Sequence, residues 1–174
     1  TLPTVYFARS CDSGDCPPGL LGLMAKEAGG TFPDHDFSLS FDGSSGGWLA
    51  LDPSPPADAV RIPFDTSYRG FYTIHGLTVV DAAGTAHTMS AVVDSGTTLC
   101  EFAPASNVRL GGAIKVYAPG SAAGEAPLLT LNAGDTDTSD GVGDAFPPQT
   151  FVLGLPFFRG RHVAFSGSGV ITVF

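Results

Sequence analysis

Positive charge is scarce in this chain of 174 residues. It carries 8 Lys and Arg against 17 Asp and Glu, which gives a formal net charge of −9. Proteins bind nucleic-acid phosphates through clusters of Lys and Arg, and the same residues attract a protein to an anionic membrane surface. The sequence has no such cluster, so we expect neither partner. An acidic surface with few cations also suits an acidic compartment, where protonated carboxylates repel one another less.

Long apolar runs are also missing. No run approaches the roughly 20 residues of a membrane-spanning helix, so we expect no membrane span. The sequence shows no signal peptide and no initiator Met, and residues 1–7 have the pattern of the middle of a strand. These features predict a chain that begins inside a larger protein.

Cysteines are few and odd in number. Cys11 and Cys16 enclose a short polar loop in which Gly14 supplies the bend, and we expect a local disulfide there and hence an oxidising compartment. We expect Cys100 to be a buried thiol, with a bond to a segment outside this sequence as the alternative.

No pattern of metal ligands is visible. Cys11 and Cys16 have no second ligand pair at a suitable distance along the sequence. The histidines also lack metal-binding spacing, so each is expected to be a surface or packed residue: His35, His75, His87 and His162. We therefore expect no metal and no cofactor.

Glycine, proline and apolar side chains are abundant. Hydrophobic residues make up 43% and charged residues 14% of the chain, which is typical of a globular protein. The 23 Gly and 14 Pro favour many turns between short strands over a helical bundle. We expect an all-β fold, an antiparallel sandwich or barrel, with Trp48 and the Phe residues in its core.

Apolar runs and period-two alternation place the expected strands. They lie at residues 2–9, 37–41, 48–51, 60–63, 72–79, 91–94, 128–131, 151–154, 161–165 and 170–174. The strands at 37–41 and 48–51 should form a hairpin. We expect a helical turn at 25–28 and exposed loops over the rest of 119–148.

One segment has the composition of a catalytic loop, Val92-Val93-Asp94-Ser95-Gly96-Thr97-Thr98. Two β-branched residues bring Asp94 to a strand end, and Gly96 permits a tight turn with free backbone amides. Three hydroxyl groups follow within reach of the carboxylate. Such donors favour its ionised form and fix its orientation.

This segment resembles the active-site motif of pepsin-like aspartic peptidases. Members of that family have a second element, two apolar residues and a Gly, which passes under the catalytic loop of each lobe. Residues 151–154, ending at Gly154, resemble the C-lobe copy, and residues 19–23 around Gly22 resemble the N-lobe copy. Residues 37–51 and 71–79 are similar to the hairpin and strands of plant-type members, so the resemblance covers nearly the whole chain.

The resemblance implies roles for the motif residues. Asp94 would be the C-lobe catalytic aspartate, and Ser95 would interlock with its counterpart from the other lobe. Gly96 would give its backbone amide to the carboxylate, Thr97 would hydrogen-bond the outer oxygen, and Thr98 would lie next to the substrate groove.

The resemblance also implies an incomplete bilobal fold of pepsin-like acid-protease β-barrel or sandwich lobes. Residues 1–63 would be the second half of the N-lobe and residues 64–174 the C-lobe. The family hydrolyses peptide bonds in proteins and peptides with water activated between two aspartates, without a cofactor. The N-lobe Asp-Thr-Gly and the flap Tyr are not found in this sequence, so the isolated chain should be inactive. A secreted, vacuolar or lysosomal location is implied.

One segment partly matches the missing N-lobe Asp-Thr-Gly motif. Asp12-Ser13-Gly14 follows residues 8–11, which cannot form a buried apolar strand, and it precedes Asp15-Cys16 where Ser or Thr is needed. No room for a flap remains before residues 19–23. We therefore interpret it as a loop.

Some positions depart from the family pattern. Leu155 and Ser166 stand where many members have an acidic or amide residue, and Gly154 follows Asp94 by only 60 residues. Two other functions stay open. The missing upstream motif allows a non-catalytic pepsin-like binding or inhibitor protein, and the 60-residue spacing fits a retropepsin-like homodimer with two copies of Asp94.

Overall fold

A computed structural model of the chain describes residues 35–41, 47–68, 70–121 and 125–174. Several predictions from the sequence lie outside these ranges: the strand at 2–9, the helical turn at 25–28, Gly22 and its element, the Cys11–Cys16 disulfide and the loop at 12–14.

The described chain is mostly β-structure, which confirms the all-β prediction. The strands are β1 (Phe37–Phe41), β2 (Gly47–Leu51), β3 (Val60–Pro63), β4 (Thr73–Val80), β5 (Ala86–Val93), β6 (Cys100–Phe102), β7 (Ile114–Tyr117), β8 (Leu129–Leu131), β9 (Thr136–Thr138), β10 (Thr150–Leu153), β11 (Val163–Ser166) and β12 (Val170–Val173). The helical elements are α1 (Asp140–Ala145) and three short 3-10 turns, η2 (Pro104–Ser106), η3 (Ala133–Asp135) and η4 (Leu155–Phe157). No helix of the described ranges is long and apolar enough to cross a membrane.

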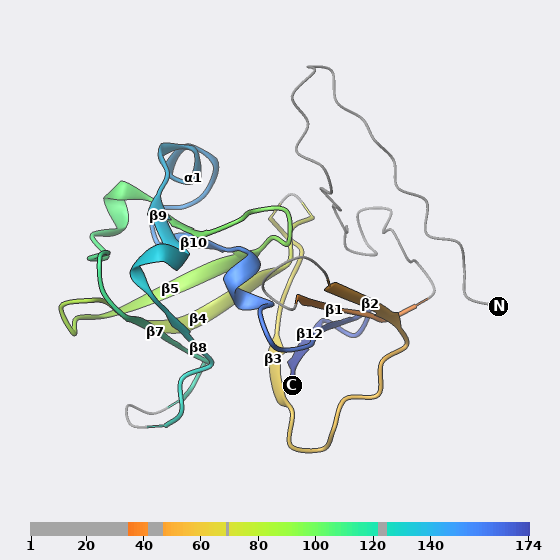
Figure 1. The fold of residues 1–174 in the computed structure, drawn as a ribbon. Helices are drawn as coiled ribbons and strands as arrows, with labels where there is room; N and C mark the ends of the chain where they lie inside the picture. The colour runs from red at the N-terminus through yellow and green to blue at the C-terminus, as the bar shows by residue number, and fades with distance from the viewer. Residues whose placement is uncertain (1–34, 42–46, 69, 122–124) are drawn as a thin grey trace.

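The strands form two sheets (Figure 1). The first has the order β2-β1-β11-β12-β3, and the second has the order β8-β7-β4-β5-β10-β6-β9. The first sheet joins strands from both predicted units, because β1 pairs with β11 and β3 pairs with β12. The predicted hairpin is confirmed by the antiparallel pairing of β1 with β2.

Most neighbouring strands are antiparallel, but two pairs are not. β10 runs parallel to β5, and β9 runs parallel to β6. The expected antiparallel arrangement therefore holds for most strand pairs but not for these two. Both parallel pairs join strands separated by long connections, as a parallel pairing requires.

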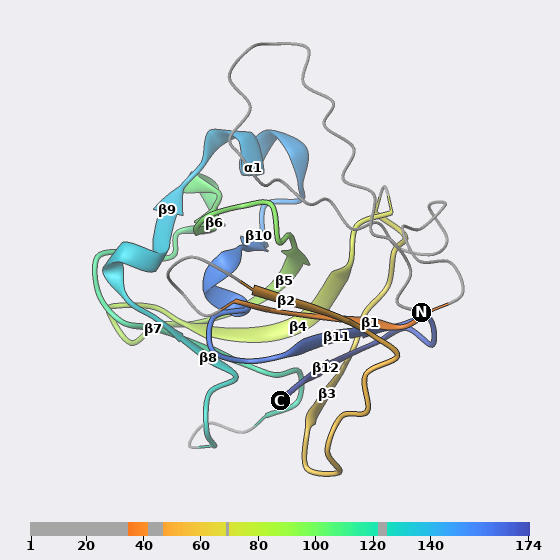
Figure 2. The same cartoon turned by 45° about the vertical axis from the view of Figure 1, so that its right-hand side comes forward.

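One hydrophobic cluster joins the two sheets. It contains Phe37 and Phe165 from the five-stranded sheet and Ile74, Phe151 and Leu153 from the seven-stranded sheet. On the opposite face of the seven-stranded sheet, Val142 of α1 packs against Ala103 and Val152. Figure 2 shows α1 on that side, away from the five-stranded sheet. The strand β10, with Phe151 and Leu153 on one face and Val152 on the other, therefore lies between two packed layers.

Two large aromatic residues of the described ranges are exposed and not in the core. Trp48 is 71% exposed and Phe71 is 41% exposed, against the expectation that they are buried. Side chains of a strand point alternately to its two faces, and in β2 the more buried positions are Leu49 and Leu51. Trp48 therefore points away from the core. Other Phe residues are buried as expected: Phe37, Phe102, Phe151, Phe157, Phe158 and Phe165.

Residues 119–148 contain more structure than the sequence indicated. They include η3, β9 and α1 in addition to the expected strand β8. The strand β7, just before this segment, was also not predicted. α1 has two Gly among its six residues, so its local sequence gives little helix signal.

Candidate active site

Asp94 lies directly beyond the end of β5. Val92 and Val93 are 1% and 6% exposed and anchor the end of the strand in packed surroundings. The backbone N–H of Asp94 donates to the carbonyl of Leu153 at 3.0 Å, and the N–H of Val93 donates to the carbonyl of Tyr72 at 2.9 Å. The parallel pairing with β10 thus continues to Asp94, which fixes the position of its backbone.

The Asp94 carboxylate is held through both of its oxygens. The backbone N–H of Gly96 donates to Oδ1 at 2.8 Å, and the hydroxyl of Thr97 donates to Oδ2 at 2.9 Å. The N–H of Thr97 also donates to the carbonyl of Asp94 at 3.3 Å, which closes the turn. The side chain is half-buried, so the carboxylate is oriented and still reachable from solvent.

Gly154 lies against the loop that carries Asp94. A Cβ atom at this position would lie 2.0 Å from the carbonyl oxygen of Leu99 and 2.5 Å from that of Thr97. The N–H of Leu155 donates to the same Thr97 carbonyl at 2.8 Å. Only glycine permits this approach, because a methyl group would overlap two backbone oxygens. The structure thus brings together the two sequence elements that the resemblance joined.

The remaining motif residues are less closely engaged with the carboxylate. Of the three hydroxyls expected within its reach, that of Thr97 makes the hydrogen bond. Ser95 is half-buried and Thr98 is exposed. Thr98 is therefore on the surface beside the loop, where a ligand could contact it.

Cys100 lies just beyond the loop, in β6. It is a free, fully buried thiol, as expected from the sequence. Burial raises the pKa of the Cys100 thiol to about 12, although a hydrogen bond from the Gly154 backbone acts in the opposite direction. The thiol is therefore protonated and packs as a small apolar side chain.

An aromatic cluster that the sequence did not indicate lies on the α1 side of the sheet. Phe146 contacts Tyr68 and Phe71, with ring centroids 5.3 and 5.8 Å apart. The Tyr68 hydroxyl donates to the carbonyl of Ala145. Because Tyr72 pairs with Val93, Phe71 comes near the end of β5 and presents a partly exposed ring. The sequence signal for this cluster was limited to Tyr68 and Phe71, the two aromatic residues on either side of Gly70. Their partner, Phe146, lies 75 residues beyond Phe71 in the sequence.

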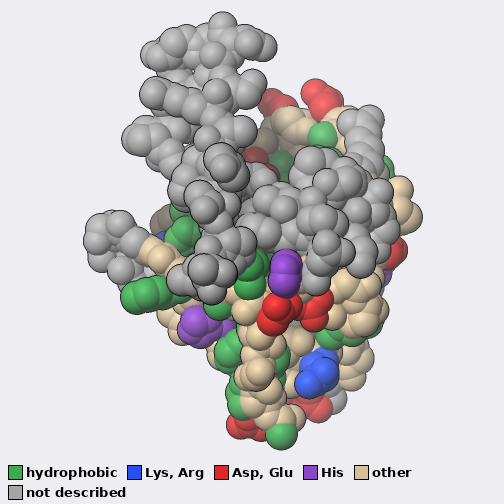
Figure 3. All heavy atoms as spheres, turned by 90° about the vertical axis from the view of Figure 1, so that its right-hand side faces the viewer, with side chains coloured by type: hydrophobic (Ala, Val, Ile, Leu, Met, Phe, Trp, Pro, Cys, Tyr) green, Lys and Arg blue, Asp and Glu red, His purple; other side chains and the backbone are tan. Residues whose placement is uncertain are grey.

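The four histidines are surface or packed residues in the structure. Three of them contact carboxylates: His35 with Asp52, His75 with Asp65 and His87 with Asp81. The fourth, His162, stacks on Phe174. Figure 3 shows a histidine against acidic side chains on the face it draws.

A network around His75 lies on the surface of β4 and β5. The two ring nitrogens of His75 contact Ser90 Oγ at 2.9 Å and Asp65 Oδ2 at 2.8 Å. The Ser67 hydroxyl donates to Asp65 and, together with the hydrogen bond to His75, holds the pKa of that carboxyl below its usual value. The described residues contain no group of three or more His, Cys, Asp or Glu side chains arranged for a metal.

Comparison with protein-family models finds no match for this chain, and comparison with curated proteins finds none either. The structure shows a two-sheet β fold with an oriented aspartate, and the function of the chain is inferred from that site.

Proposed function

We propose that this chain supplies one catalytic aspartate, Asp94, to a pepsin-like aspartic endopeptidase. The observation that carries the proposal is the pair of contacts made by its carboxylate, from the Gly96 amide and the Thr97 hydroxyl. The close approach of Gly154 to the same loop supports it. An Asp-Gly turn that only ended a strand would need neither the Thr97 contact nor this second element.

The proposed reaction is hydrolysis of a peptide bond in a peptide or protein substrate. An ionised carboxylate takes a proton from water, and the resulting nucleophile attacks the carbonyl carbon. A second, protonated aspartate polarises the carbonyl oxygen and later returns a proton to the amine that leaves. Two carboxylates that share one proton achieve this because both cannot ionise at once. No cofactor takes part.

The second aspartate would come from an N-lobe segment that the sequence does not contain. In this proposal residues 1–63 complete the N-lobe and residues 64–174 form the C-lobe, in a secreted, vacuolar or lysosomal enzyme. The exposed ring of Phe71 offers an apolar surface near the end of β5 for a substrate side chain. In this proposal the 174-residue chain by itself would be inactive, because it supplies one of the two aspartates.

The test compares the chain alone with the chain joined to an N-terminal lobe that carries Asp-Thr-Gly and a flap. Only the joined protein should cleave a peptide substrate at acidic pH, and Asp94→Ala should abolish the cleavage. Asp58→Asn is a matched control, because Asp58 is an exposed carboxylate away from the loop. Peptide cleavage by the Asp94→Ala variant would contradict the proposal.

The same preparations separate the two alternatives. A retropepsin-like homodimer requires cleavage by the chain alone and twice the chain mass in sedimentation. A binding or inhibitor protein requires a folded joined protein that binds peptide without cleaving it.

A further inference from the structure

A second aspartate, Asp81, forms a structural unit with His87. Asp81 Oδ1 accepts the backbone N–H groups of Ala83 and Thr85, each at 2.9 Å. Its Oδ2 accepts the N–H of Arg109 at 3.2 Å and contacts Nε2 of His87 at 3.1 Å. The Asp81 side chain is only 2% exposed. A carboxylate that receives three backbone amides is an acceptor at both oxygens, so Nε2 of His87 is the donor.

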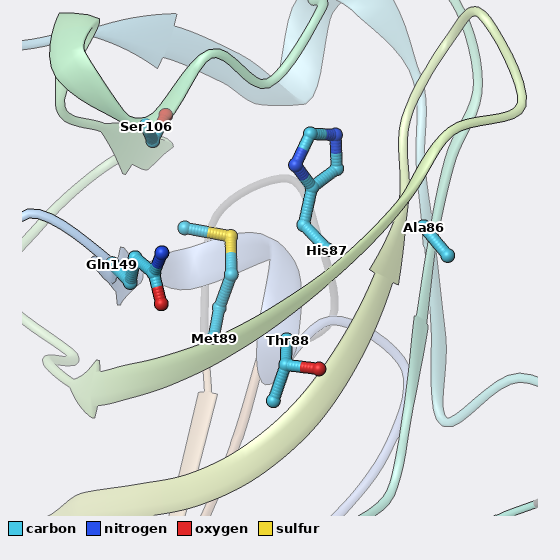
Figure 4. A pocket seen from close by; sticks show the side chains of 6 residues that line it. All are labelled: Ala86, His87, Thr88, Met89, Ser106 and Gln149. Carbon is cyan, nitrogen blue, oxygen red and sulfur yellow. The ribbon is translucent and has the colours of Figure 1, made fainter.

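This arrangement fixes which nitrogen of the His87 ring is free. In the neutral ring the single proton is on Nε2, and Nδ1 keeps its lone pair. Figure 4 shows one ring nitrogen on the side of the hollow where Met89 and Gln149 lie. Nδ1 is that nitrogen, because Nε2 is occupied by Asp81.

The hollow itself has a volume of about 300 Å³. Its lining comprises Ala86, His87, Thr88, Met89, Ser106 and Gln149. His87 and Met89 are two residues apart in β5, so both side chains lie on the same face of the strand. Met89 is 3% exposed and belongs to the main hydrophobic cluster, and its side chain also lines the hollow.

The donors at this hollow are neutral and include a soft one. They are an imidazole nitrogen, a thioether sulfur, two hydroxyls and an amide, whereas the nearby carboxylate is already saturated by hydrogen bonds. Hard divalent cations bind carboxylate oxygens, but a thioether selects Cu(I). A ligating histidine commonly donates its other ring N–H to a carboxylate, as His87 does to Asp81. The negative charge of Asp81 would balance a monovalent cation.

We propose that His87 Nδ1 and Met89 Sδ bind one Cu(I) ion, with Asp81 as the residue that positions the ring. The site is separate from the Asp94 loop and does not depend on peptidase activity. It revises the sequence-based expectation that His87 is not a ligand, because that expectation considered the spacing of histidines and cysteines and not a thioether.

The binding test is an anaerobic Cu(I) titration of the full chain against a chromophoric competitor. Cys11→Ser and Cys16→Ser form the background, because thiolates also bind Cu(I). We expect one ion per chain, and at least tenfold weaker binding in Met89→Leu and in His87→Gln. Met24→Leu and His75→Gln are the matched controls and should bind as the background does. Unchanged affinity in both site variants would overturn the proposal.

A second measurement needs no substitution at the site. The chain has two methionines, so methyl-labelled methionine gives two NMR signals, which Met24→Leu assigns. One equivalent of Cu(I) should shift the Met89 methyl signal and leave the Met24 signal in place. A Met89 signal that does not move would contradict the proposal even if a site variant failed to fold.

Discussion

Asp81 and Asp94 occupy similar places and have different surroundings. Each follows one strand of the β4–β5 pair, and each accepts the amide of the residue two positions further on. Asp81 is buried and has four hydrogen-bonding contacts. Asp94 is half-buried, and within the described residues two donors reach its carboxylate.

The difference separates a structural carboxylate from an available one. An ionised carboxylate has about four acceptor positions. At Asp81 all of them are used to fix the turn and the His87 ring. At Asp94 two contacts set the orientation, and the remaining acceptor capacity is left for water or a second carboxyl group. The same Asp turn therefore serves stability in one place and, in our proposal, chemistry in the other.

The largest expected effect concerns the glycines that accompany the two turns. Gly154→Ala should lower the free energy of unfolding by more than about 4 kcal/mol, because its methyl group would overlap the Leu99 and Thr97 carbonyls. Gly84, in the Asp81 turn, has a φ of 83° and open space around a Cβ. Gly84→Ala should therefore cost only about 1 to 2 kcal/mol of backbone strain.

Urea unfolding followed by circular dichroism measures both changes. Gly134→Ala is the control, because a Cβ there meets nothing within 4 Å and no positive φ is involved. It should stay within about 0.5 kcal/mol of the parent. Equal destabilisation by Gly154→Ala and Gly84→Ala would show that the Asp94 loop has no special support.

The next largest difference is expected between substitutions that remove the charge of Asp81 or of Asp94. Asp81→Asn places an amide donor among backbone donors in a buried site, so it should lower the unfolding midpoint far more than Asp58→Asn. Asp94→Asn should change the free energy of unfolding by less than about 1 kcal/mol, since its side chain is half-buried. The reverse order would mean that Asp94 is the structural residue.

The stability of the fold should decrease at acidic pH, and Asp81 should contribute to this decrease. Burial opposes ionisation of Asp81, but the hydrogen bonds from His87 and three backbone amides outweigh it and hold its pKa well below the usual value. A lowered pKa in the folded state contributes stability above the unfolded pKa of about 3.9, and this contribution is lost as the pH falls toward the folded value. Asp135 adds to the same loss, because contacts with Asn132 and Arg159 outweigh its burial and lower its pKa.

Unfolding midpoints at pH 6, 4 and 2.5 measure this dependence. The unfolding midpoint of the parent should change little between pH 6 and pH 4 and should fall below pH 4. Asp81→Asn should show a flatter decline than the parent over the same interval. Parallel curves for the parent and Asp81→Asn would exclude Asp81 as a source of the decline.

The smallest effect is expected at the hydroxyl that orients Asp94. Thr97→Val removes the donor to Oδ2 and should cost about 1 kcal/mol in stability. Thr98→Val should change stability by less than about 0.5 kcal/mol, because Thr98 is exposed. Denaturant unfolding of Thr97→Val and of Thr98→Val tests whether one of the two hydroxyls or both stabilise the loop. Equal effects at the two positions would contradict the observed geometry.

Local sequence patterns predicted much of this fold. Alternation and β-branched runs predicted the β1–β2 hairpin, β3, β4 and the last residues of β5, because hairpin strands depend on nearby residues. Amide and hydroxyl donors within reach of the Asp94 carboxylate were predicted from the local sequence, and the particular contacts of Gly96 and Thr97 were implied by the family resemblance. The approach of Gly154 was expected only from the family resemblance.

Features that depend on distant residues were not predicted. The parallel pairing of β5 with β10 joins segments about 60 residues apart, and no local pattern sets that register. The contact of Asp135 with Arg159 spans 24 residues, and both looked like surface charges in the sequence. Trp48 was assigned to the core by residue type, but the face of β2 on which it lies depends on the pairing of that strand.

The rate of peptide cleavage by the joined two-lobe protein and its Asp94→Asn variant tests the central claim most directly. Asn has nearly the shape of Asp but cannot take a proton from water. We predict a loss of kcat of about 10³-fold or more, with the unfolding midpoint unchanged and with Asp58→Asn as active as the parent. Equal kcat values for the parent and Asp94→Asn would contradict the assignment of Asp94 as a catalytic residue.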